Sequence, residues 1–379
     1  MIKVGLLGTG YIGGVHLEAL ARIGGVKVTA VSDVNLDLAN KAAARFNIEK
    51  ACNDPMEIIK DRNIDVIHNC TPNKFHYILN REALNQGKHI LSEKPLSMTS
   101  GEAEELVNIA VKKGAVTGVD FCYRYYPVVQ EMAVRIRRGE CGDVRMATGS
   151  WFQDWLCYTT DYSWRLDKSE SGESNITADL GSHWFDLIQF VTGLNVTEVL
   201  GDLVTIIKER KKPKRQVLAF EKAGNVETET VRIEVDDYSC ILFRLSNGAP
   251  GSFTTSQLCQ GRKSTTEFQI YGSQCSFAWD HRRSNELWIG YRDKPNETLV
   301  ENAQLQDLST AKYANLPAGH PLGYHDAVLN LFKDYYEDVK NGGSDKNSNR
   351  PTFCTGYDEM KILDAVLESK KNQTWAEVK

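Results

Sequence analysis

Short apolar runs alternate with helix-like stretches along the first third of the chain. The runs typical of buried strands lie at residues 4–7, 26–31, 66–70, 89–91 and 116–119. Between them, apolar residues three or four positions apart predict helices at 15–23, 36–46, 55–60, 75–86 and 99–113. Apolar strands that alternate with helices are typical of a parallel sheet covered on both faces. We therefore expect a doubly wound α/β domain over residues 1–122.

The pattern changes after residue 122. Helix periodicity appears at 127–138, 179–191, 325–340 and 357–371, whereas two-residue alternation predicts strands at 144–152, 196–207, 228–235, 239–245, 252–256, 265–271 and 286–289. Ser246-Asn247-Gly248 is typical of a hairpin turn between antiparallel strands. We expect residues 123–379 to form an α+β domain with a large, mainly antiparallel open sheet. The charged stretch 208–214 and the polar stretch 341–349 are predicted to be surface loops.

Composition narrows the class of protein. The chain has 379 residues, enough for two domains, and 41% hydrophobic with 25% charged residues indicates a packed globular protein. A net charge of −5 argues against a general nucleic-acid or anionic-membrane binder. No apolar run approaches the ~20 residues of a membrane span, and the start of the chain lacks a signal-peptide pattern. The nine cysteines form no C-x-x-C pair, so we expect a cytoplasmic protein with neither disulfides nor a metal site.

A glycine fingerprint directly follows the first predicted strand. Gly8-Thr9-Gly10-Tyr11-Ile12-Gly13 has the form G-x-G-x-x-G and precedes an amphipathic helix. In a Rossmann domain the first glycine allows the tight turn, the second admits the pyrophosphate, and the third lets helix and strand pack closely. The helix N-terminus then offers free amides to the phosphates. This motif predicts a dinucleotide site.

Asp33 supports that prediction and bears on the choice of cofactor. It ends the second predicted strand, 20 residues after Gly13, where an acid meets the adenosine ribose. A carboxylate accepts hydrogen bonds from the ribose hydroxyls but repels a 2′-phosphate, and Val34-Asn35-Leu36 supplies no basic residue to offset that repulsion. We therefore expect NAD rather than NADP.

Two further polar segments follow predicted strands, where a doubly wound sheet binds its ligands. They are 70–73 with His76 a turn later, and Glu93-Lys94-Pro95. A third candidate segment carries Asp179 and His183 four residues apart, on one helical face. Oxidation of an alcohol needs a base for the hydroxyl proton, for which His183 is suited, and a cation near the developing alkoxide, for which Lys94 is suited.

Each of these residues also has a structural interpretation. Lys94 precedes a proline and is compatible with an exposed turn, and His183 beside Trp184 is compatible with a satisfied interior histidine. Asp179 either orients the imidazole or binds substrate. Asp186, three residues past His183, is expected to be a structural partner.

Together these motifs resemble those of the Gfo/Idh/MocA oxidoreductases. The glycine fingerprint, Thr-Pro-Asn, Glu-Lys-Pro and Asp-x-x-x-His occur here in that family's order and spacing, and the resemblance covers the whole chain. Segments 153–155, 163–165 and 247–249 are most similar to sugar and glycoside dehydrogenases such as levoglucosan dehydrogenase. The resemblance implies a catalytic Lys94 with partners Asp179 and His183, and a homodimer or homotetramer formed through the C-terminal sheet. It implies that the NAD site is lined by Gly8, Gly10, Tyr11, Ile12, Gly13, Asp33, Thr71, Asn73, His76, Glu93, Lys94, Arg124, Trp164 and Arg165.

The substrate side has weaker candidates. Gln153 and Trp155 suit a polyol, although a tryptophan in a strand is as often a packing residue. His320 and Tyr324 flank a Gly/Pro-punctuated loop that either covers the substrate or is a plain turn. With Lys94, Asp179 and His183, these residues predict a cleft for a small polyhydroxylated ligand.

The leading hypothesis is therefore an NAD-dependent dehydrogenase that oxidises a secondary hydroxyl of a sugar, glycoside or cyclitol. Two alternative enzymes are an NAD-dependent glycosidase with a cycling cofactor and an NADP(H)-dependent sugar reductase. A third alternative is an NAD(H)-sensing protein, against which the proton-transfer residues argue.

Overall fold

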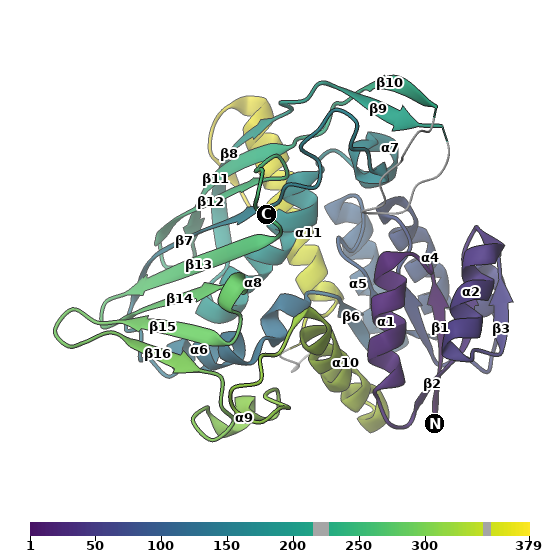
Figure 1. Ribbon diagram of the computed structural model, residues 1–379, viewed down its shortest axis with the longest axis horizontal. Coiled ribbons are helices and arrows are strands. Elements are labelled where there is room, and N and C mark those ends of the chain that lie inside the picture. Colours follow the sequence, from purple (N-terminus) through teal and green to yellow (C-terminus); the bar gives the residue numbers. More distant parts are fainter. Residues whose placement is uncertain (215–226, 344–349) are drawn as a thin grey trace.

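The computed structural model describes residues 1–214, 227–343 and 350–379. Figure 1 shows two sheets on opposite sides of the molecule, with helices α10 (Tyr324–Asn341) and α11 (Phe353–Asn372) between them in this view. The expected pairing of a doubly wound sheet with a large, mainly antiparallel sheet is confirmed. None of the described helices is long and apolar enough to cross a membrane.

The first sheet has six parallel strands in the order β3-β2-β1-β4-β5-β6. Strands β1 to β3 are added toward one edge of the sheet, and β4 to β6 are added toward the other edge. The boundary between β1 and β4 is therefore the switch point at which such sheets bind dinucleotides. The strand β3 was not predicted. The elements are β1 (Ile2–Leu7), α1 (Tyr11–Ala21), β2 (Val26–Ser32), α2 (Leu36–Phe46), β3 (Lys50–Cys52), α3 (Met56–Ile59), β4 (Val66–Asn69), α4 (Asn73–Asn85), β5 (His89–Ser92), α5 (Ser100–Lys113) and β6 (Thr117–Val119).

Local side-chain chemistry sets several of these boundaries. The Asn35 side chain accepts a hydrogen bond from the amide of Asp37 and caps α2, as the Thr99 hydroxyl caps α5. Gly114, with φ of 62°, ends α5 in the left-handed conformation. Strand β4 is buried along its whole length, as expected for a sheet covered by helices on both faces.

The second sheet has nine strands in the order β16-β15-β14-β13-β7-β12-β11-β8-β17, antiparallel except where β12 pairs with β7. Ile241 and Phe243 of β11 are buried on one face, against which α8 packs its Trp184. The elements are α6 (Pro127–Arg137), β7 (Val144–Phe152), α7 (Lys168–Ser171), a π-helical turn (Thr177–Gly181), α8 (Ser182–Thr192), β8 (Val196–Val204), β11 (Tyr238–Leu245), β12 (Pro250–Ser256), β13 (Thr265–Gly272), β14 (Ser276–Asp280), β15 (Glu286–Gly290), β16 (Glu297–Val300), α9 (Leu308–Ala311) and β17 (Ala376–Glu377).

The prediction of a loop at 208–214 was wrong. Glu209–Pro213 forms strand β9, which pairs with β10 (Thr228–Arg232) in a separate two-stranded sheet. The reason is Arg210, whose buried guanidinium donates to the carbonyl oxygens of Leu156 and Tyr158, 2.9 and 2.8 Å away. One inward-facing arginine therefore anchors a stretch whose other charges face solvent. Of the polar stretch 341–349, residues 344–349 lie outside the described part of the chain.

The end of the chain returns to the first sheet. The amide of Val119 donates to the carbonyl oxygen of Pro351, and the amide of Phe353 donates to the Thr117 hydroxyl, at 3.0 and 3.1 Å. Helix α11 thus begins against β6, and the chain then ends in β17, which pairs with β8 of the large sheet. The two sheets are held together by the last 30 residues.

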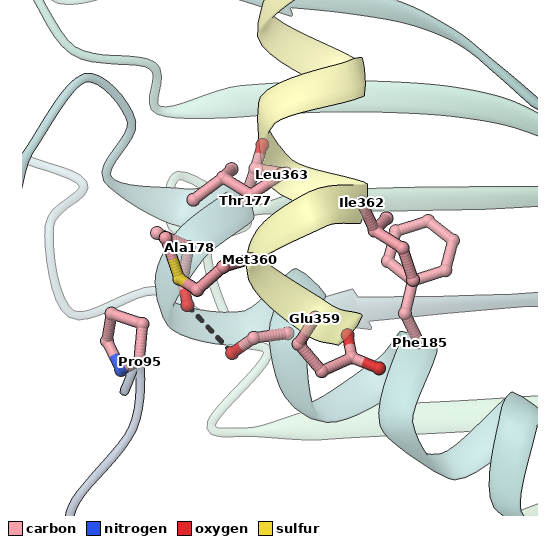
Figure 2. A pocket seen from close by; sticks show the side chains of 9 residues that line it. Pro95, Thr177, Ala178, Phe185, Glu359, Met360, Ile362 and Leu363 are labelled. Atoms are coloured by element: carbon pink, nitrogen blue, oxygen red, sulfur yellow. Dashed lines mark hydrogen bonds between the residues drawn. The ribbon is translucent and has the colours of Figure 1, made fainter. Parts of the chain in front are cut away.

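Helix α11 also supports the loop after β5. Figure 2 shows Met360 and Leu363 of α11 facing Ala178 of the π-helical turn, with Pro95 beside them. The void that they enclose measures about 10 Å³, barely enough for one water molecule. The loop and the turn therefore rest on a nearly close-packed surface.

Glu359 of α11 is a buried carboxyl next to this void. Its Oε1 accepts a hydrogen bond from the Gln189 side chain at 2.8 Å, whereas Oε2 has no partner in the described residues. Burial, with the nearby negative charge of Asp186, raises the pKa of Glu359 well above its usual value. The folded protein therefore keeps a proton on Glu359 at pH values where the unfolded chain loses it.

This difference predicts a pH-dependent stability. Above pH ~4.5 the folded state binds more protons at Glu359 than the unfolded state, so the wild-type free energy of unfolding falls as pH rises. Glu359→Gln keeps the shape and removes the titration, so between pH 5 and 8 its free energy of unfolding should fall less steeply, by up to about 1.4 kcal/mol per pH unit. Urea unfolding at several pH values measures this. The exposed Glu368→Gln on the same helix is the control, and parallel curves for Glu359→Gln and wild type would contradict the prediction.

Candidate active site

The loop after β1 has the shape that a dinucleotide needs. Gly8 has a φ of 88°, and a Cβ there would lie 2.6 Å from the carbonyl oxygen of Cys70. A Cβ on Gly13 would lie 2.1 Å from the carbonyl oxygen of Gly8, so neither position accepts a side chain. Gly10, at the N-cap of α1, has open space around it and offers no side-chain cap. The first amides of α1 are therefore available to a pyrophosphate, as predicted.

Asp33 connects the end of β2 to this loop. Its Oδ2 accepts hydrogen bonds from the amide and the hydroxyl of Thr9, at 2.8 and 3.0 Å, and its Oδ1 accepts one from the amide of Asn35 at 3.0 Å. The carboxylate is thus held at the edge of the loop, half-exposed beside the 78% exposed Val34. This is the position from which an acid reaches an adenosine ribose.

A cleft of about 970 Å³ lies between the first sheet and the large sheet. It is bounded by the start of α1, the ends of β5 and β6, strand β7, the π-helical turn and the start of α10. The predicted site residues that line it are Tyr11, Ile12, Glu93, Lys94, Gln153, Trp155, Arg165, Asp179, His183 and Tyr324. Candidates for cofactor and for substrate therefore share one cleft.

Lys94 and Asp179 meet in this cleft from opposite parts of the chain. The Lys94 ammonium donates to Oδ1 of Asp179 at 2.5 Å and to its backbone carbonyl at 2.9 Å. Arg165 Nε lies 3.3 Å from the same Oδ1. Burial alone would raise the pKa of Asp179, but the charges of Lys94 and Arg165 hold that pKa well below its usual value. Asp179 is therefore ionised, and two of the three ammonium protons of Lys94 are engaged by it.

His183 lies in the same cleft among aromatic rings. The ring centroid of Tyr123 is 5.1 Å from that of the imidazole, and the centroid of Trp151 is 5.8 Å away. Its Nδ1 is buried and has no hydrogen-bond partner among the described residues. Burial, followed by the charge of Lys94, lowers the pKa of His183 to about 3. The imidazole is therefore neutral.

Thr71 and Asn73 lie beside the cofactor loop but outside the cleft lining. The amide nitrogen of Thr71 is 3.1 Å from where a Cβ on Gly8 would lie, which places Thr71 against the loop. The Asn73 side chain donates to the carbonyl oxygen of Ser171 at 3.2 Å and connects α4 to the second half of the chain. Trp164 stacks on the guanidinium of Arg165, 4.6 Å from its ring centroid. These three predicted site residues are not part of the cleft lining, although Trp164 contacts Arg165, which is.

Three predicted site residues are placed where they have other partners. His76 is 1% exposed and both ring nitrogens face backbone carbonyl oxygens, of Pro95 at 2.6 Å and of Thr71 at 2.7 Å. Arg124 is buried in a bidentate pair with Asp186, which confirms Asp186 as a structural partner. His320 is exposed in a turn of its own, where its Nδ1 lies 3.0 Å from the carbonyl oxygen of Pro317. None of the three lines the cleft, because hydrogen bonding or exposure directs each side chain elsewhere.

The structure adds residues that the sequence reasoning missed. Asp120 follows β6, and the rule that ligands bind at strand ends would have found it. The others carry no signal in the sequence, since loops and strands far apart bring them to the cleft. These are Tyr123, Trp151, Leu180, Lys263, Ser264, His281 and His325.

Comparison with known proteins agrees with this geometry. Residues 2–121 match an oxidoreductase family with an NAD-binding Rossmann fold, and residues 129–278 match the GFO/IDH/MocA C-terminal domain. The chain belongs to the Gfo/Idh/MocA oxidoreductase family. It is therefore an NAD-binding oxidoreductase, and the open glycine loop at α1 fits that cofactor.

Relatives of this Gfo/Idh/MocA oxidoreductase include sugar and cyclitol enzymes. Levoglucosan dehydrogenase of Pseudarthrobacter phenanthrenivorans is 28% identical, with 100% of this chain and 98% of the relative covered. Myo-inositol 2-dehydrogenase of Thermotoga maritima is 26% identical, with 98% and 96% covered. A levoglucosan dehydrogenase structure in complex with NADH and L-sorbose has a TM-score of 0.89 and 27% identity, with 100% of this chain and 99% of that chain covered.

The position of Asp33 predicts a preference for NAD over NADP. Asp33→Ala should weaken NAD binding by about 10- to 100-fold, the range for a lost charged hydrogen bond, and so narrow the gap to NADP. Asp33→Asn keeps the shape but removes the charge, so it should mainly improve NADP binding. Calorimetric titration with both cofactors measures these changes. Equal affinities of the wild-type protein for NAD and NADP would refute the assignment of Asp33 to the ribose.

Proposed function

We propose that this protein is an NAD-dependent dehydrogenase that oxidises a secondary hydroxyl of a sugar, glycoside or cyclitol. The observation that carries the proposal is the Lys94–Asp179 ion pair in one cleft with a neutral His183 and the open glycine loop. The sugar and cyclitol dehydrogenases among the relatives support this class of substrate.

Lys94 and His183 divide the proton and charge chemistry. Bound NAD supplies the hydride acceptor. The Lys94 ammonium has one N–H left after its two bonds to Asp179, and this N–H donates a hydrogen bond to the reacting oxygen as its negative charge develops. His183 Nε2 accepts the hydroxyl proton, because burial and Lys94 keep the ring neutral and able to accept. With a pKa of about 3, His183 passes that proton on to solvent.

Asp179 fixes this arrangement and binds the substrate with other polar groups. Its second oxygen, Oδ2, lies 3.4 Å from the Gln257 amide. Gln153 accepts a hydrogen bond from Trp155 at 2.9 Å, which leaves its amide group oriented beside an aromatic surface. Gln153, Trp155 and Tyr324 are assigned to the substrate, while Tyr11, Ile12, Glu93 and Arg165 are assigned to the cofactor. Such a mixture of amides, charges and aromatic rings suits a small polyhydroxylated ligand.

Residues 1–122 are proposed as the NAD-binding domain, and residues 123–379 as the domain for substrate binding and subunit contacts. Lys94 and Arg165 are the residues that each domain contributes to the other domain's ligand. Five of the nine cysteines are buried free thiols, which supports a location in the reducing cytoplasm.

The face of the large sheet opposite α8 is assigned to a second copy of the chain. It exposes Met146, Leu242 and Trp288, at 38%, 43% and 38%. Apolar side chains spread over a broad sheet face favour burial against another subunit. We therefore expect a homodimer or homotetramer.

Light scattering tests this assembly. The wild-type protein at micromolar concentration should have at least twice the monomer mass of 42.6 kDa. Leu242→Arg should lower that mass, because it places a charge in the buried interface. Leu305→Arg, at a residue 63% exposed away from the sheet, is the matched control and should leave the mass unchanged. A monomeric wild-type protein would exclude the assigned interface.

Turnover of candidate sugars tests the reaction. A dehydrogenase accumulates NADH steadily at 340 nm when sugars, glycosides and cyclitols are screened with NAD. A glycosidase with a cycling cofactor instead releases its aglycone without net NADH, and a reductase shows activity only with NADPH. Absence of all three activities in the screen would favour an NAD(H)-sensing protein.

Lys94→Ala should lower kcat on the identified substrate by about 10²–10³-fold, the usual cost of losing one electrostatic donor. His183→Ala should also lower kcat, with a residual rate that rises with pH as hydroxide replaces the base. Asp179→Asn should act on kcat less than Lys94→Ala if Asp179 only orients, and comparably if it also binds the reacting hydroxyl. NAD affinity, measured separately, should survive all three changes but be lost in Gly10→Val. Near wild-type turnover in both Lys94→Ala and His183→Ala would place the active site elsewhere.

The pKa of His183 predicts the acid side of the pH profile. Since this pKa lies near 3, the imidazole stays able to accept a proton throughout the range from pH 5 to 8. A plot of kcat/KM against pH should therefore have no inflection near pH 6.5 and no loss of activity there. An inflection there that disappears in His183→Gln would show that His183 titrates normally.

A further inference from the structure

His16 lies buried beneath the cleft, where α1 crosses the ends of β5 and β6. It is 0% exposed, and its Nε2 lies 3.2 Å from Oε1 of Glu93 and 3.2 Å from Oδ2 of Asp120. Both carboxylates line the cleft. The other oxygen of Asp120, Oδ1, is buried and has no hydrogen-bond partner in the described part of the chain. The proposed mechanism assigns no work to His16.

The opposite side of the ring continues into a hydrogen-bonded chain. His16 Nδ1 lies 2.9 Å from Nδ1 of His68, and His68 Nε2 lies 2.8 Å from the Tyr336 hydroxyl. When both ring nitrogens of His16 carry a proton, every ring nitrogen in this chain has a hydrogen-bond partner. His16 Nδ1 donates to His68 Nδ1, and His68 Nε2 donates to the Tyr336 hydroxyl. Burial opposes the charge, but the neighbours Cys70, Asp120 and Glu93 raise the pKa of His16 well above its usual value. Burial and the His16 charge lower the pKa of His68, which stays neutral.

Among the described residues, no second cation forms an ion pair with Glu93 or Asp120. The Lys94 ammonium is directed at Asp179, and only the Lys94 amide donates to Glu93, at 3.2 Å. Within the described ranges, His16 is the one cation within hydrogen-bond distance of Glu93 or Asp120. Burial raises the pKa of the acidic groups around the carboxylates, Cys70, Cys122 and Tyr324, and lowers the pKa of the two histidines, His76 and His183.

The triad lies at the end of the sheet where the nicotinamide half of the cofactor belongs. A dinucleotide crosses the switch point of a doubly wound sheet, and Asp33 at the end of β2 marks the adenosine half. The other half therefore lies over β5 and β6, whose ends carry Glu93 and Asp120. This step rests on the cofactor placement given under Proposed function.

We infer that His16 is a positioning residue whose ring holds the carboxyl groups of Glu93 and Asp120 side by side, and that this triad sets the preference of the site between NAD⁺ and NADH. With His16 charged, the triad keeps a single net negative charge beneath the nicotinamide. That charge attracts the cationic ring of NAD⁺ and has no such effect on the neutral ring of NADH. Without the imidazolium, two adjacent carboxylates cannot both stay ionised at neutral pH, so one takes up a proton.

The test compares cofactor binding by the wild-type protein and by His16→Gln. Fluorescence or calorimetry measures the affinities for NAD⁺ and NADH at pH 6 and pH 8, without substrate. Wild-type affinities for NAD⁺ and NADH should both be nearly independent of pH. In His16→Gln the second carboxylate ionises as pH rises, so NAD⁺ should bind about fivefold to tenfold more tightly at pH 8 than at pH 6, while NADH affinity stays flat. Turnover does not enter this measurement, so a wrong substrate assignment leaves it intact.

Tyr336→Phe is the matched control, because it removes a buried hydrogen bond of the same chain but leaves the carboxylates paired. It should lower Tm and keep both affinities independent of pH. An equal, pH-independent weakening of NAD⁺ and NADH in His16→Gln would overturn the inference, since it indicates a purely structural role. His16, Glu93 and Asp120 are also spaced to hold a metal ion, so a wild-type affinity that EDTA abolishes and Zn²⁺ restores would equally overturn it.

Discussion

The arrangement of the active site depends on one ion pair that joins the two halves of the chain. Lys94 follows a strand of the first sheet, and Asp179 lies on a π-helical turn beside the second sheet. Their side chains are only 11% and 15% exposed, so each needs the other in order to stay charged in the cleft. Burial, followed by the charge of Lys94, lowers the pKa of His183 beside the pair, so the imidazole stays neutral.

The surrounding structure holds this pair in place from behind. His76 holds the segment before α4 and the Glu-Lys-Pro loop together through two backbone carbonyl oxygens. Helix α11 packs against Pro95 and the π-helical turn, with only a small void between them. The same helix is tied to β6 at its start and leads to a strand of the large sheet at its end. Residues that do not touch the cleft therefore determine its geometry.

Charge compensation is used twice at this end of the first sheet. The Lys94 ammonium pairs with Asp179, and the His16 ring lies 3.2 Å from both Glu93 and Asp120. The two groups do not exchange partners, because the Lys94 ammonium points across the cleft and His16 lies beneath it. A third buried pair, Arg124 with Asp186, supports α8, which carries His183. Each buried carboxylate of these groups lies next to a basic side chain, and Glu93 and Asp120 share one, as the low dielectric of the interior requires.

The sequence by itself determined the doubly wound domain and the glycine loop, because each depends on local spacing, and it singled out Lys94, Asp179 and His183 as candidates for the site. Strand periodicity, a G-x-G-x-x-G turn and a four-residue helical repeat are properties of short segments. Tertiary structure alone decided which side chains face the cleft. Arg124 and His76 are turned to buried partners, Arg210 converts a charged stretch into a strand, and Asp120 joins His16 from another element. Burial and pairing between distant residues determine the orientation of these side chains, and the spacing of neighbouring residues in the sequence predicts neither.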